Sequence, residues 1–472
     1  MDLSKVKKIY MVGIKGVGMT MLAEFLVAHG YQVSGSDISE VFMTDAVLAK
    51  SHINVYTDLS VDHLHDVPDL VVYSLAYSVD NHPELQEAKK RNLKIASYSE
   101  TLGAVFNTYH GVAVCGSHGK TTTSAWLGFV LWKALLHPNV MVGAAVPQFT
   151  GASLTGNSNY LIVEADEYKN KLQYLNPKMI LLNNIDFDHP DYFLTIESYH
   201  KVFRDFIARL PKSGKLIANF DDDQIRSMSE KGTSGEVISY SLHSPADYVA
   251  ENIRYQAGRQ YFKVCLYSKD KHALEENETN DLGDFSILLS GQHNISNALA
   301  VIIAALELGA ELHLVRRYLG EFTGTARRMQ VLGEYNQAII IDDYAHHPTE
   351  IVATLDAITQ KYSGKKIRVV FHPHTFSRTK ALLSSFGKSF TKADEVIVLD
   401  IYGSAREEQG GVSGAEVAQE IKYNGHEHVQ FIPTLQEVEV YLRSSAHKDE
   451  VIVLMGAGDV FKIGEQLLYG HN

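Results

Sequence analysis

One short segment of this 472-residue chain brings together the residue types that bind phosphate: Gly116-Ser117-His118-Gly119-Lys120-Thr121-Thr122-Thr123. Residues 111–115 form an apolar run typical of a buried strand, and a helical pattern follows the segment. Small residues let the backbone turn tightly, so that its N–H groups point at an anion near the positive end of the helix dipole. In such a loop, Lys120 contacts the β- and γ-phosphates of a nucleotide, and the hydroxyl of Thr121 binds Mg²⁺.

The spacing of the glycines differs from the strict Walker pattern, because two residues rather than four separate Gly116 from Gly119. The alternative is a glycine-rich turn beside an unrelated Lys-Thr pair. However, strand, loop and helix follow one another in the order that phosphate binding requires. We therefore predict that this segment binds ATP.

Two further strand-like runs end in residue types that bind metal. Residues 159–163 lead into Glu164-Ala165-Asp166-Glu167, and residues 179–182 lead into Asn183-Asn184-Ile185-Asp186-Phe187-Asp188-His189. In an open α/β sheet, ligands bind at the edge formed by the carboxyl ends of the strands. Carboxylate oxygens suit Mg²⁺, and a neutral histidine can complete a second site beside the phosphates. A solvated acidic loop is the alternative for residues 164–167.

The helix predicted over residues 295–309 begins beside several polar side chains. The imidazole of His293 and the amides of Asn294 and Asn297 could contact a base or a phosphate. Helix capping by Ser290 or Asn294 explains the same pattern equally well. The residues alone do not decide between these two interpretations.

The N-terminal segment has the pattern of a βαβ unit. A strand-like run, residues 8–12, opens into a loop with Gly13, Gly16 and Gly18, and a helix and a second strand lead to Asp37. The glycine order is GxxGxG rather than the GxGxxG of dinucleotide-binding proteins, but Asp37 stands where such folds place a ribose-binding carboxylate. A ligand that carries phosphate or a nucleotide is favoured over ordinary loop chemistry, and NAD is not favoured.

Four strand-like runs in the last third of the chain lead into polar or glycine-rich loops. These loops are residues 342–350 (DDYAHHPTE), 372–379 (HPHTFSRT), 400–407 (DIYGSARE) and 455–459 (MGAGD). Together they predict one rim of a cleft, which Arg378 and Arg406 make suitable for anions. A zinc site is the weaker alternative, because the histidine pairs lack i,i+4 spacing: His346 with His347, and His372 with His374.

Composition restricts the class of protein. The formal net charge is −13 without a long basic run, which argues against binding to nucleic acid or to an anionic membrane surface. The two cysteines are too few for a disulfide framework. The N-terminus reaches a strand and a glycine loop too early for a signal peptide. We therefore expect a cytoplasmic protein, and nothing in the sequence indicates an obligate protein partner.

The motifs resemble those of the Mur ligase family, and they follow the family's order along the whole chain. The series is an N-terminal glycine loop, GSHGKTTT, VEADE, NNIDFDHPD, GQHNISN, the pair Arg327-Arg328, DDYAHHPTE, PHTFSRT and MGAGD. The resemblance implies an α/β protein with three domains. They are a Rossmann-like UDP-binding domain (residues 1–108), a central P-loop ATPase-type domain with a parallel sheet (residues 109–322) and a C-terminal Rossmann-like domain (residues 323–472).

The resemblance also implies a reaction. VGIKGVGM, DDYAHHPTEI, PHTFSRT and DIYGSARE look most like the branch that joins L-alanine to UDP-N-acetylmuramate in peptidoglycan precursor synthesis. In that branch the lactyl carboxylate attacks the γ-phosphate of ATP, an acyl phosphate forms, the amine of alanine attacks it, and phosphate leaves. The branch that attaches a recycled tripeptide to the same nucleotide is the alternative. An NAD-dependent oxidoreductase is a distant one, and it would leave the phosphate loop unused.

Motif by motif, the resemblance implies roles for individual residues. Those implied to bind ATP are Gly116, Ser117, His118, Gly119, Lys120, Thr121, Thr122, His293, Asn294 and Asn297, with Arg327 or Arg328 and Asp342 or Asp343. Those implied to bind Mg²⁺ are Thr121, Glu164 and His189. Those implied to bind the UDP-sugar are Gly13, Gly16, Gly18, Ser36, Asp37 and Ser74. Those implied to bind the amino acid are Tyr344, His347 and Arg378. The catalytic set is Lys120, Glu164, His189, His347 and Arg378.

Two positions depart from the pattern of the family. Alanine-adding members often carry arginine where Thr375 stands, which leaves Arg378 as the residue of that loop to pair with the alanine carboxylate. Several sister ligases carry a carbamylated lysine at a position where this chain has Phe203, with Lys201 slightly offset. The sequence therefore predicts no carbamate, in agreement with the alanine-adding branch.

Overall fold

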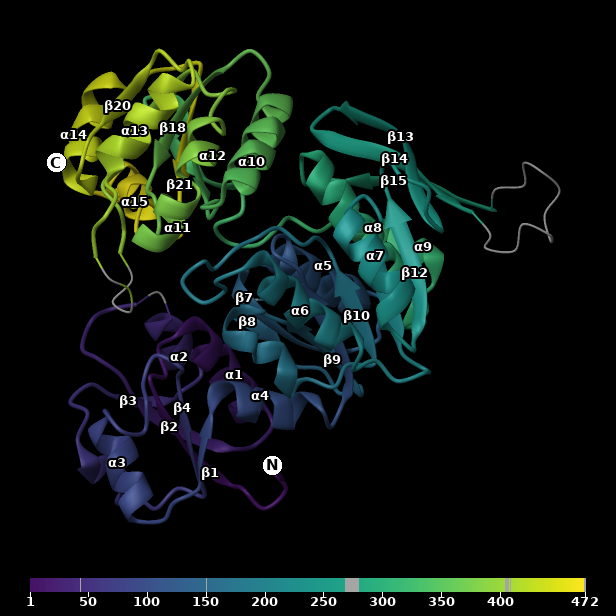
Figure 1. The fold of residues 1–472 in the computed structure, drawn as a ribbon, viewed down its shortest axis with the longest axis vertical. Helices are drawn as coiled ribbons and strands as arrows, with labels where there is room; N and C mark the ends of the chain where they lie inside the picture. Colours follow the sequence, from purple (N-terminus) through teal and green to yellow (C-terminus); the bar gives the residue numbers. More distant parts are fainter. Residues whose placement is uncertain (43, 150, 268–279, 404–406, 408, 471–472) are drawn as a thin grey trace.

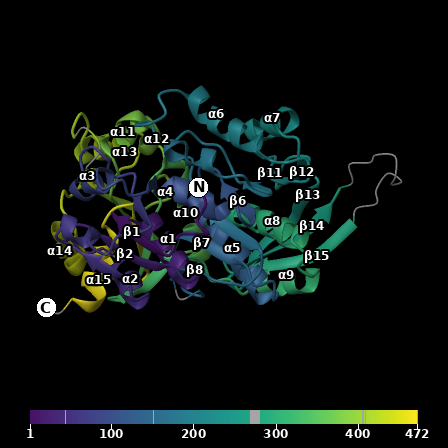
Figure 2. The same cartoon turned by 90° about the horizontal axis from the view of Figure 1, so that it is seen from below.

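A computed structural model describes residues 1–42, 44–149, 151–267, 280–403, 407 and 409–470. The chain forms three sheets that follow one another in the sequence (Figure 1). Each sheet carries helices of its own, and the three parts surround a central region where loops from different sheets meet (Figures 1 and 2). Among the described helices, none combines the length and the apolarity that crossing a bilayer requires.

The first sheet is parallel, with the strand order β3-β2-β1-β4-β5. Its strands are β1 (Lys8–Val12), β2 (Gln32–Ser36), β3 (Asn54–Tyr56), β4 (Leu70–Tyr73) and β5 (Ile95–Ser97). Its helices are α1 (Val17–Ala28), α2 (Asp45–Lys50), α3 (Pro83–Lys90) and α4 (Tyr98–Phe106), with a 3-10 turn at Val61–Leu64. The predicted βαβ unit is therefore present, and its glycine loop lies between β1 and α1.

The second sheet has ten strands in the order β15-β14-β13-β12-β11-β10-β6-β9-β7-β8. They are β6 (His110–Cys115), β7 (Asn139–Val146), β8 (Gly151–Leu154), β9 (Tyr160–Glu164), β10 (Met179–Leu182), β11 (Lys215–Asn219), β12 (Glu236–Ser241), β13 (Tyr248–Gln256), β14 (Arg259–Leu266) and β15 (Asn280–Ile287). The middle strands are parallel, as predicted. The two ends of the sheet are antiparallel, at β7–β8 and β13–β15, which the sequence did not predict.

Five α-helices accompany this sheet: α5 (Lys120–Lys133), α6 (Ile196–Ile207), α7 (Asp223–Gly232), α8 (Gln292–Glu307) and α9 (Leu312–Leu319), and Tyr168–Tyr174 forms 3-10 turns. Helix α5 is buried along nearly its whole length, because it lies between the sheet and α8 and α9. Trp126 of α5 stacks on Phe322, with 5.3 Å between the ring centroids. Helix α5, which begins at Lys120, is thus held by contacts with the sheet, with α8 and with α9.

The third sheet has the order β16-β17-β21-β18-β19-β20, and it is parallel except for the edge strand β16. Its strands are β16 (Gln330–Tyr335), β17 (Ala338–Asp343), β18 (Lys366–Phe371), β19 (Glu395–Val398), β20 (Val429–Phe431) and β21 (Glu450–Met455). Its helices are α10 (Pro348–Lys361), α11 (Phe376–Ala381), α12 (Leu383–Gly387), α13 (Gly414–Tyr423), α14 (Leu435–Ser445) and α15 (Phe461–Tyr469).

The three parts are joined by different kinds of contact. One apolar cluster runs from Phe25 of α1 through Phe106 of α4 to Leu172 and Ile180 of the second part. The third sheet has apolar clusters of its own. The first two parts therefore share a core, whereas the third meets the second through polar groups described below.

Candidate active site

The loop between β6 and α5 needs its two glycines. Gly116 has φ 126°, and a Cβ there would lie 2.8 Å from the carbonyl oxygen of Asn184. Gly119, the N-cap of α5, is left-handed with φ 77°, and a Cβ there would lie 2.8 Å from Oδ1 of Asn297. Any larger residue would be strained and would push away a neighbouring loop. The short glycine spacing of the sequence thus corresponds to a compact turn at the start of a helix.

Lys120 points back over this loop and uses all three donors of its ammonium group. It donates to the carbonyl oxygens of Gly116 at 2.6 Å and Ser117 at 3.1 Å, and to Oε2 of Glu167 at 2.9 Å. Burial lowers the pKa of Lys120, but the nearby carboxylates of Glu167, Asp166 and Glu164 together outweigh burial and raise it. The ammonium is therefore charged at neutral pH. Glu167 was not among the predicted site residues, although it ends the acidic run that begins at Glu164.

The predicted metal ligands Thr121 and Glu164 lie together beside Lys120. Thr121 Oγ1 donates to Oε1 of Glu164 at 2.8 Å, and Oε2 of Glu164 accepts from the backbone N–H of Gly143 at 2.6 Å. A hydroxyl and a carboxylate are oxygen ligands of the kind that Mg²⁺ prefers. The residues present fit a magnesium ion at the mouth of the phosphate loop.

His189 lies on the other side of Glu167. Its Nε2 is 3.6 Å from Oε1 of Glu167, and the ligand atoms of Asp166, Glu167 and His189 lie within 4.8 Å of one another. His189 was predicted as a metal ligand together with Thr121 and Glu164, whereas the structure groups it with Asp166 and Glu167. The strand ends of β9 and β10 bring these three residues together.

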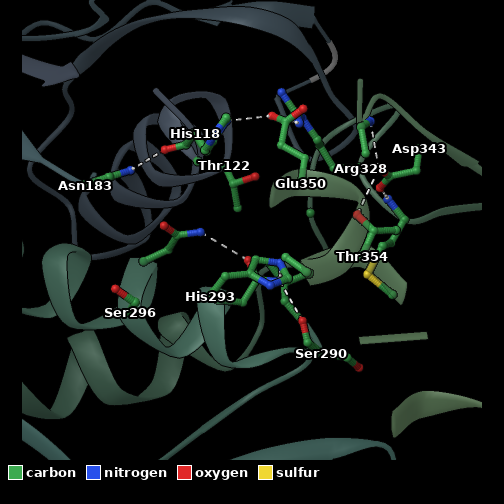
Figure 3. Close-up of a pocket in the computed structure, with 18 of the residues that line it drawn as sticks. His118, Thr122, Asn183, Ser290, His293, Ser296, Arg328, Asp343, Glu350 and Thr354 are labelled. Carbon is green, nitrogen blue, oxygen red and sulfur yellow. Dashed lines mark hydrogen bonds and ion pairs between the residues drawn. The ribbon is translucent and has the colours of Figure 1, made fainter. Parts of the chain in front are cut away.

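A cavity of about 740 Å³ lies between the second and third parts of the chain, and the phosphate loop borders it with His118 and Gly119. This volume is within the range of small-molecule sites. Figure 3 shows His118, Thr122 and Asn183 on one wall, the start of α8 with Ser290, His293 and Ser296 on another, and Arg328, Asp343, Glu350 and Thr354 across from them. Gly119, Asn294 and Asn297 also line it.

The structure separates the two members of each predicted pair. Arg328 and Asp343 line the cavity. In contrast, Arg327 forms an ion pair with Asp342 at 3.2 Å and donates to the carbonyl oxygens of residues 456–458. Burial raises the pKa of Asp342 to about 6, although Arg327 opposes this rise. Arg327 and Asp342 therefore hold the glycine loop after β21, and Arg328 and Asp343 face the cavity.

Neither side chain considered as a helix cap performs that role at α8. The N-cap is Gly291, which offers no side chain. Asn294 Nδ2 donates to the carbonyl oxygen of Ser290 at 2.7 Å, and Asn297 Nδ2 donates to Oδ1 of Asn294 at 3.3 Å. The capping interpretation is wrong. Burial, aided by the charge of Arg328, lowers the pKa of His293 to about 4, so this histidine is a neutral group in the cavity wall.

Arg378 is buried where the second and third parts meet. Its Nε donates to Oδ1 of Asp188 at 2.8 Å, and its Nη1 lies 3.3 Å from Nδ1 of His374. Asp188 follows β10 and Arg378 lies on α11, so this ion pair joins two sheets. Burial raises the pKa of Asp188, but the guanidinium of Arg378 together with His189 and His346 holds it well below its usual range, so the carboxylate remains charged.

The two adjacent histidines after β17 lie in different places. His347 is the N-cap of α10, and its Nδ1 is 3.4 Å from Oδ2 of Asp186. His346 instead lies beside Tyr344 and His374, with ring centroids 5.2 and 6.1 Å away. Of the residues predicted to bind the amino acid, Tyr344 and Arg378 thus share a region with His346, while His347 lies toward the phosphate loop.

His118 bridges the same two parts of the chain. Its Nε2 is 3.0 Å from Oδ2 of Asp186, and its Nδ1 is 3.2 Å from Oε1 of Glu350 on α10. Burial lowers the pKa of His118, but the hydrogen bonds to both carboxylates outweigh it and raise the pKa to about 9. Glu350 also lies 3.6 Å from Arg328. Glu350 was not among the predicted site residues, although its position three residues after His347 is that of a capping box.

A smaller cavity of about 190 Å³ adjoins the glycine loop of the first part. Gly16, Gly18 and Ser74 line it, together with Lys169 and Lys171 of the second part. Lys169 Nζ reaches the carbonyl oxygen of Leu75 at 3.5 Å, and Lys171 forms an ion pair with Asp166. Three of the residues predicted to bind a UDP-sugar therefore border one cavity, and lysines from another part face them.

The remaining predicted residues of the first part lie deeper. Ser36 donates to Glu84 within the buried interior. The carboxylate of Asp37 accepts from the backbone N–H of Lys15 at 2.7 Å and of Ile38 at 2.8 Å. Gly13 has φ 79°, and a Cβ there would lie 2.8 Å from Cβ of Ser74. These residues shape the loops around the cavity through hydrogen bonds and close packing.

Comparison with known proteins agrees with this arrangement over the whole chain. Residues 8–110, 114–305 and 327–458 match the family profiles described as "Mur ligase family, catalytic domain", "Mur ligase middle domain" and "Mur ligase, glutamate ligase domain". The UDP-N-acetylmuramate–L-alanine ligase of Desulfitobacterium hafniense is 36% identical over 463 residues, which is 98% of this chain and 99% of that protein. The chain belongs to the Mur ligase family.

Other relatives of this Mur ligase carry the same name. The UDP-N-acetylmuramate–L-alanine ligase of Caldicellulosiruptor saccharolyticus is 38% identical over 463 residues, or 98% of each chain. The crystal structure of the UDP-N-acetylmuramate–alanine ligase of Thermotoga maritima superimposes with a TM-score of 0.80 at 26% identity, covering 98% of both chains. The three-part α/β architecture predicted from the family resemblance is therefore confirmed.

In this Mur ligase the loop after β18 is described in full, whereas the loop after β19 is described only in part. Thr375 is the N-cap of α11 and has φ 66°. Arg406 lies outside the described residues. Among those described, the clusters of possible metal ligands are His118 with Asp186 and His347, and Asp166 with Glu167 and His189. The zinc site considered for His346, His347, His372 and His374 does not form among them.

We predict that His118→Asn removes a pH-dependent contribution to the stability of this Mur ligase. The pKa of His118 in the folded protein, about 9, exceeds the ordinary pKa of 6.5 for a free histidine. Its charge therefore stabilises the fold fully below about pH 6.5, by about 3 kcal/mol at most, and this contribution is lost as the pH rises through about 9. Thermal unfolding should show a Tm advantage of the wild type at about pH 6 that disappears by about pH 10.

The control is His313→Asn, because the side chain of His313 is 68% exposed. This variant should match the wild type at every pH. A wild-type advantage that grows with pH would show that His118 is not charged in the folded protein.

Proposed function

We propose that this chain is an ATP-dependent amide ligase that joins L-alanine to the lactyl carboxylate of UDP-N-acetylmuramate and releases ADP and phosphate. The observation that carries the proposal is the ion pair between Asp188 and Arg378. It joins the loop that presents His189 beside the phosphate loop to the helix that carries the candidate amino-acid residue. The names of the relatives support the choice of substrates.

The reaction requires that a carboxylate approach a polyphosphate, so negative charge must be neutralised. In the proposed sequence, the lactyl carboxylate attacks the γ-phosphorus of ATP, ADP leaves, and an acyl phosphate forms. The amine of alanine then attacks the carbonyl carbon, and the tetrahedral intermediate expels phosphate. Lys120 and the N–H groups at the start of α5 stabilise the charge that develops on the phosphoryl oxygens. Mg²⁺, bound by Thr121, Glu164 and His189, would supply further positive charge there.

The large cavity is the proposed site of the nucleotide. Gly116, Ser117, Gly119 and Thr122 would surround its phosphates. The base and ribose would then lie toward the start of α8, where His293, Asn294 and Asn297 offer neutral donors and acceptors. Across the cavity, Arg328 and Asp343 would close the third part over the nucleotide. In this proposal Arg327 and Asp342 act through the glycine loop that they hold.

The amino acid would bind between Tyr344 and Arg378, whose guanidinium retains donors beyond those used by Asp188 and His374. The attacking amine must lose a proton; His346 can orient the amine as a neutral hydrogen-bond acceptor, but its low pKa makes it too weak a base to carry that proton. Its Nδ1 lies 2.9 Å from the carbonyl oxygen of Tyr344, so Nδ1 carries the proton and Nε2 is the acceptor. Burial lowers the pKa of His346 to about 3, so the ring is neutral. His347 would act nearer the phosphate, through Asp186.

The acceptor nucleotide would bind to residues 1–108, the central ATPase unit would be residues 109–322, and residues 323–472 would bind the amino acid. Gly16, Gly18 and Ser74 would contact the UDP diphosphate at the smaller cavity, and Gly13, Ser36 and Asp37 would shape the surrounding loops. Lys169 and Lys171 add positive charge to that cavity. We place the enzyme in the cytoplasm, where ATP is available to peptidoglycan precursor synthesis.

We predict that phosphate release requires ATP, Mg²⁺, UDP-N-acetylmuramate and an amino acid together, and that L-alanine supports turnover far better than L-Ala-γ-D-Glu-diaminopimelate. A steady-state assay of phosphate release with each component omitted in turn tests the reaction. Higher kcat/KM with the tripeptide would identify the recycling branch of the family. Phosphate release without the UDP-sugar would contradict the proposed order of steps.

We predict that Lys120→Ala lowers kcat by about 100-fold or more, because the developing charge on the phosphoryl group loses its cationic partner. Its affinity for UDP-N-acetylmuramate, measured by calorimetry without ATP, should stay within about 2-fold of the wild type, since Lys120 does not line the smaller cavity. Substantial turnover by this variant would remove the phosphate loop from the mechanism.

We predict that Lys169→Ala weakens the binding of UDP-N-acetylmuramate by about 10-fold, because a charge-assisted contact with the diphosphate is lost. Binding of uridine, which has no phosphate, should not change. Lys201→Ala is the matched control, since Lys201 is 66% exposed and pairs with Asp205 on α6. An equal loss for uridine and for the UDP-sugar would show that Lys169 acts on the fold of the cavity rather than on the diphosphate.

A further inference from the structure

The hydroxyl of Tyr199 is buried at the underside of the phosphate loop. Tyr199 lies in the first turn of α6 and has no exposed surface. Its oxygen is 2.7 Å from Oγ of Ser117 and 3.3 Å from Oε1 of Glu167. One phenol thus contacts both the loop that carries Lys120 and the carboxylate that pairs with it.

The direction of these hydrogen bonds follows from the charges. Burial raises the pKa of Tyr199, and the charge of Glu167 raises it further, so the phenol keeps its proton. A carboxylate is a stronger acceptor than a hydroxyl. Tyr199 therefore donates to Glu167. The oxygen of Tyr199 can accept from the hydroxyl of Ser117, which also donates to the carbonyl oxygen of Asp186 at 2.7 Å.

Both partners of Tyr199 determine where the ammonium of Lys120 lies. The carbonyl oxygen of Ser117 and Oε2 of Glu167 are two of its three acceptors. A shift of either acceptor moves the charge relative to the phosphates. A charged group stabilises a transition state best when it is already in the correct position before the reaction. A small displacement of the ammonium of Lys120 therefore lowers the rate of phosphoryl transfer.

The ring of Tyr199 is itself held by aromatic contacts. Phe187, Phe193 and Phe203 meet it edge to face, with centroids 5.8, 5.0 and 5.2 Å away. The ring would keep its place without the hydroxyl. Loss of the hydroxyl alone can therefore be tested with little change in packing.

We propose that Tyr199 is a positioning residue for phosphoryl transfer: through Glu167 and Ser117 it fixes the ammonium of Lys120 toward the γ-phosphate. This inference rests on the proposed function and adds a residue that neither the motifs nor the family resemblance singled out. Tyr199 does not touch the nucleotide in this scheme. Its effect is confined to contacts made by Lys120.

The test compares two nucleotides that differ in the γ-phosphate. We expect Tyr199→Phe in the full-length protein with Mg²⁺ to weaken binding of a non-hydrolysable ATP analogue by about 10-fold and binding of ADP by less than about 2-fold. In turnover, kcat should fall while the KM values for L-alanine and the UDP-sugar stay constant. Tyr192→Phe is the control, because Tyr192 is 43% exposed in the same segment and packs against Phe193.

Glu167→Gln provides a second, independent variant. It should show the same selective loss, and Tyr199→Phe should then add less than about 2-fold, because both changes act through Lys120. Equal losses for ADP and the analogue, or additive losses in the double variant, would overturn the role of Tyr199 while leaving the proposed reaction intact. Failure of the wild type to bind either nucleotide would overturn the proposed function as well.

Discussion

The buried ion pair between Lys120 and Glu167 is the interaction on which the rest of the site depends. The ammonium group of Lys120 lies against a tight glycine turn with its side chain 13% exposed, and burying an ammonium without a counter-charge costs several kcal/mol. Glu167 supplies that charge at 2.9 Å. The same carboxylate lies beside His189 and Tyr199, so the residues that would bind metal and the residues that support the loop share one anchor.

The third part of the chain meets the second part through charged groups rather than through apolar surface. Asp186 and Asp188 extend from the end of β10, where they pair with His118 and Arg378. Glu350 completes the bridge from α10. Polar contacts of this kind are weaker and more adaptable than a shared core. Such contacts fit the proposed ligase reaction, in which the parts would admit three substrates, whereas the first two parts share an apolar cluster.

Several features of the site follow from short stretches of sequence. The glycines at 116 and 119, the lysine at 120 and the acidic and histidine residues after β9 and β10 could all be placed at one sheet edge, because parallel strands have their carboxyl ends on the same side. The βαβ unit at the N-terminus was predicted from its own succession of strand, glycine loop, helix and strand. The antiparallel ends of the central sheet were not predicted, although β13 and β14 pair locally across the two-residue turn Ala257-Gly258, both with positive φ. That hairpin signal was not recognised because residues 229–284 carry no chemical motif.

By itself, the sequence determined which residue types are present and in which order: a glycine loop with a lysine, carboxylates and a histidine after two strands, and an arginine and histidine rim, in the order of one family. Only the tertiary structure decided which member of each ambiguous pair faces the cavity. Arg328 and Asp343 do so, while Arg327 and Asp342 hold the loop after β21. It also revealed Glu167, Glu350 and Tyr199. Adjacent residues on a strand or turn point to opposite sides, and partners from separate sheets meet only after folding.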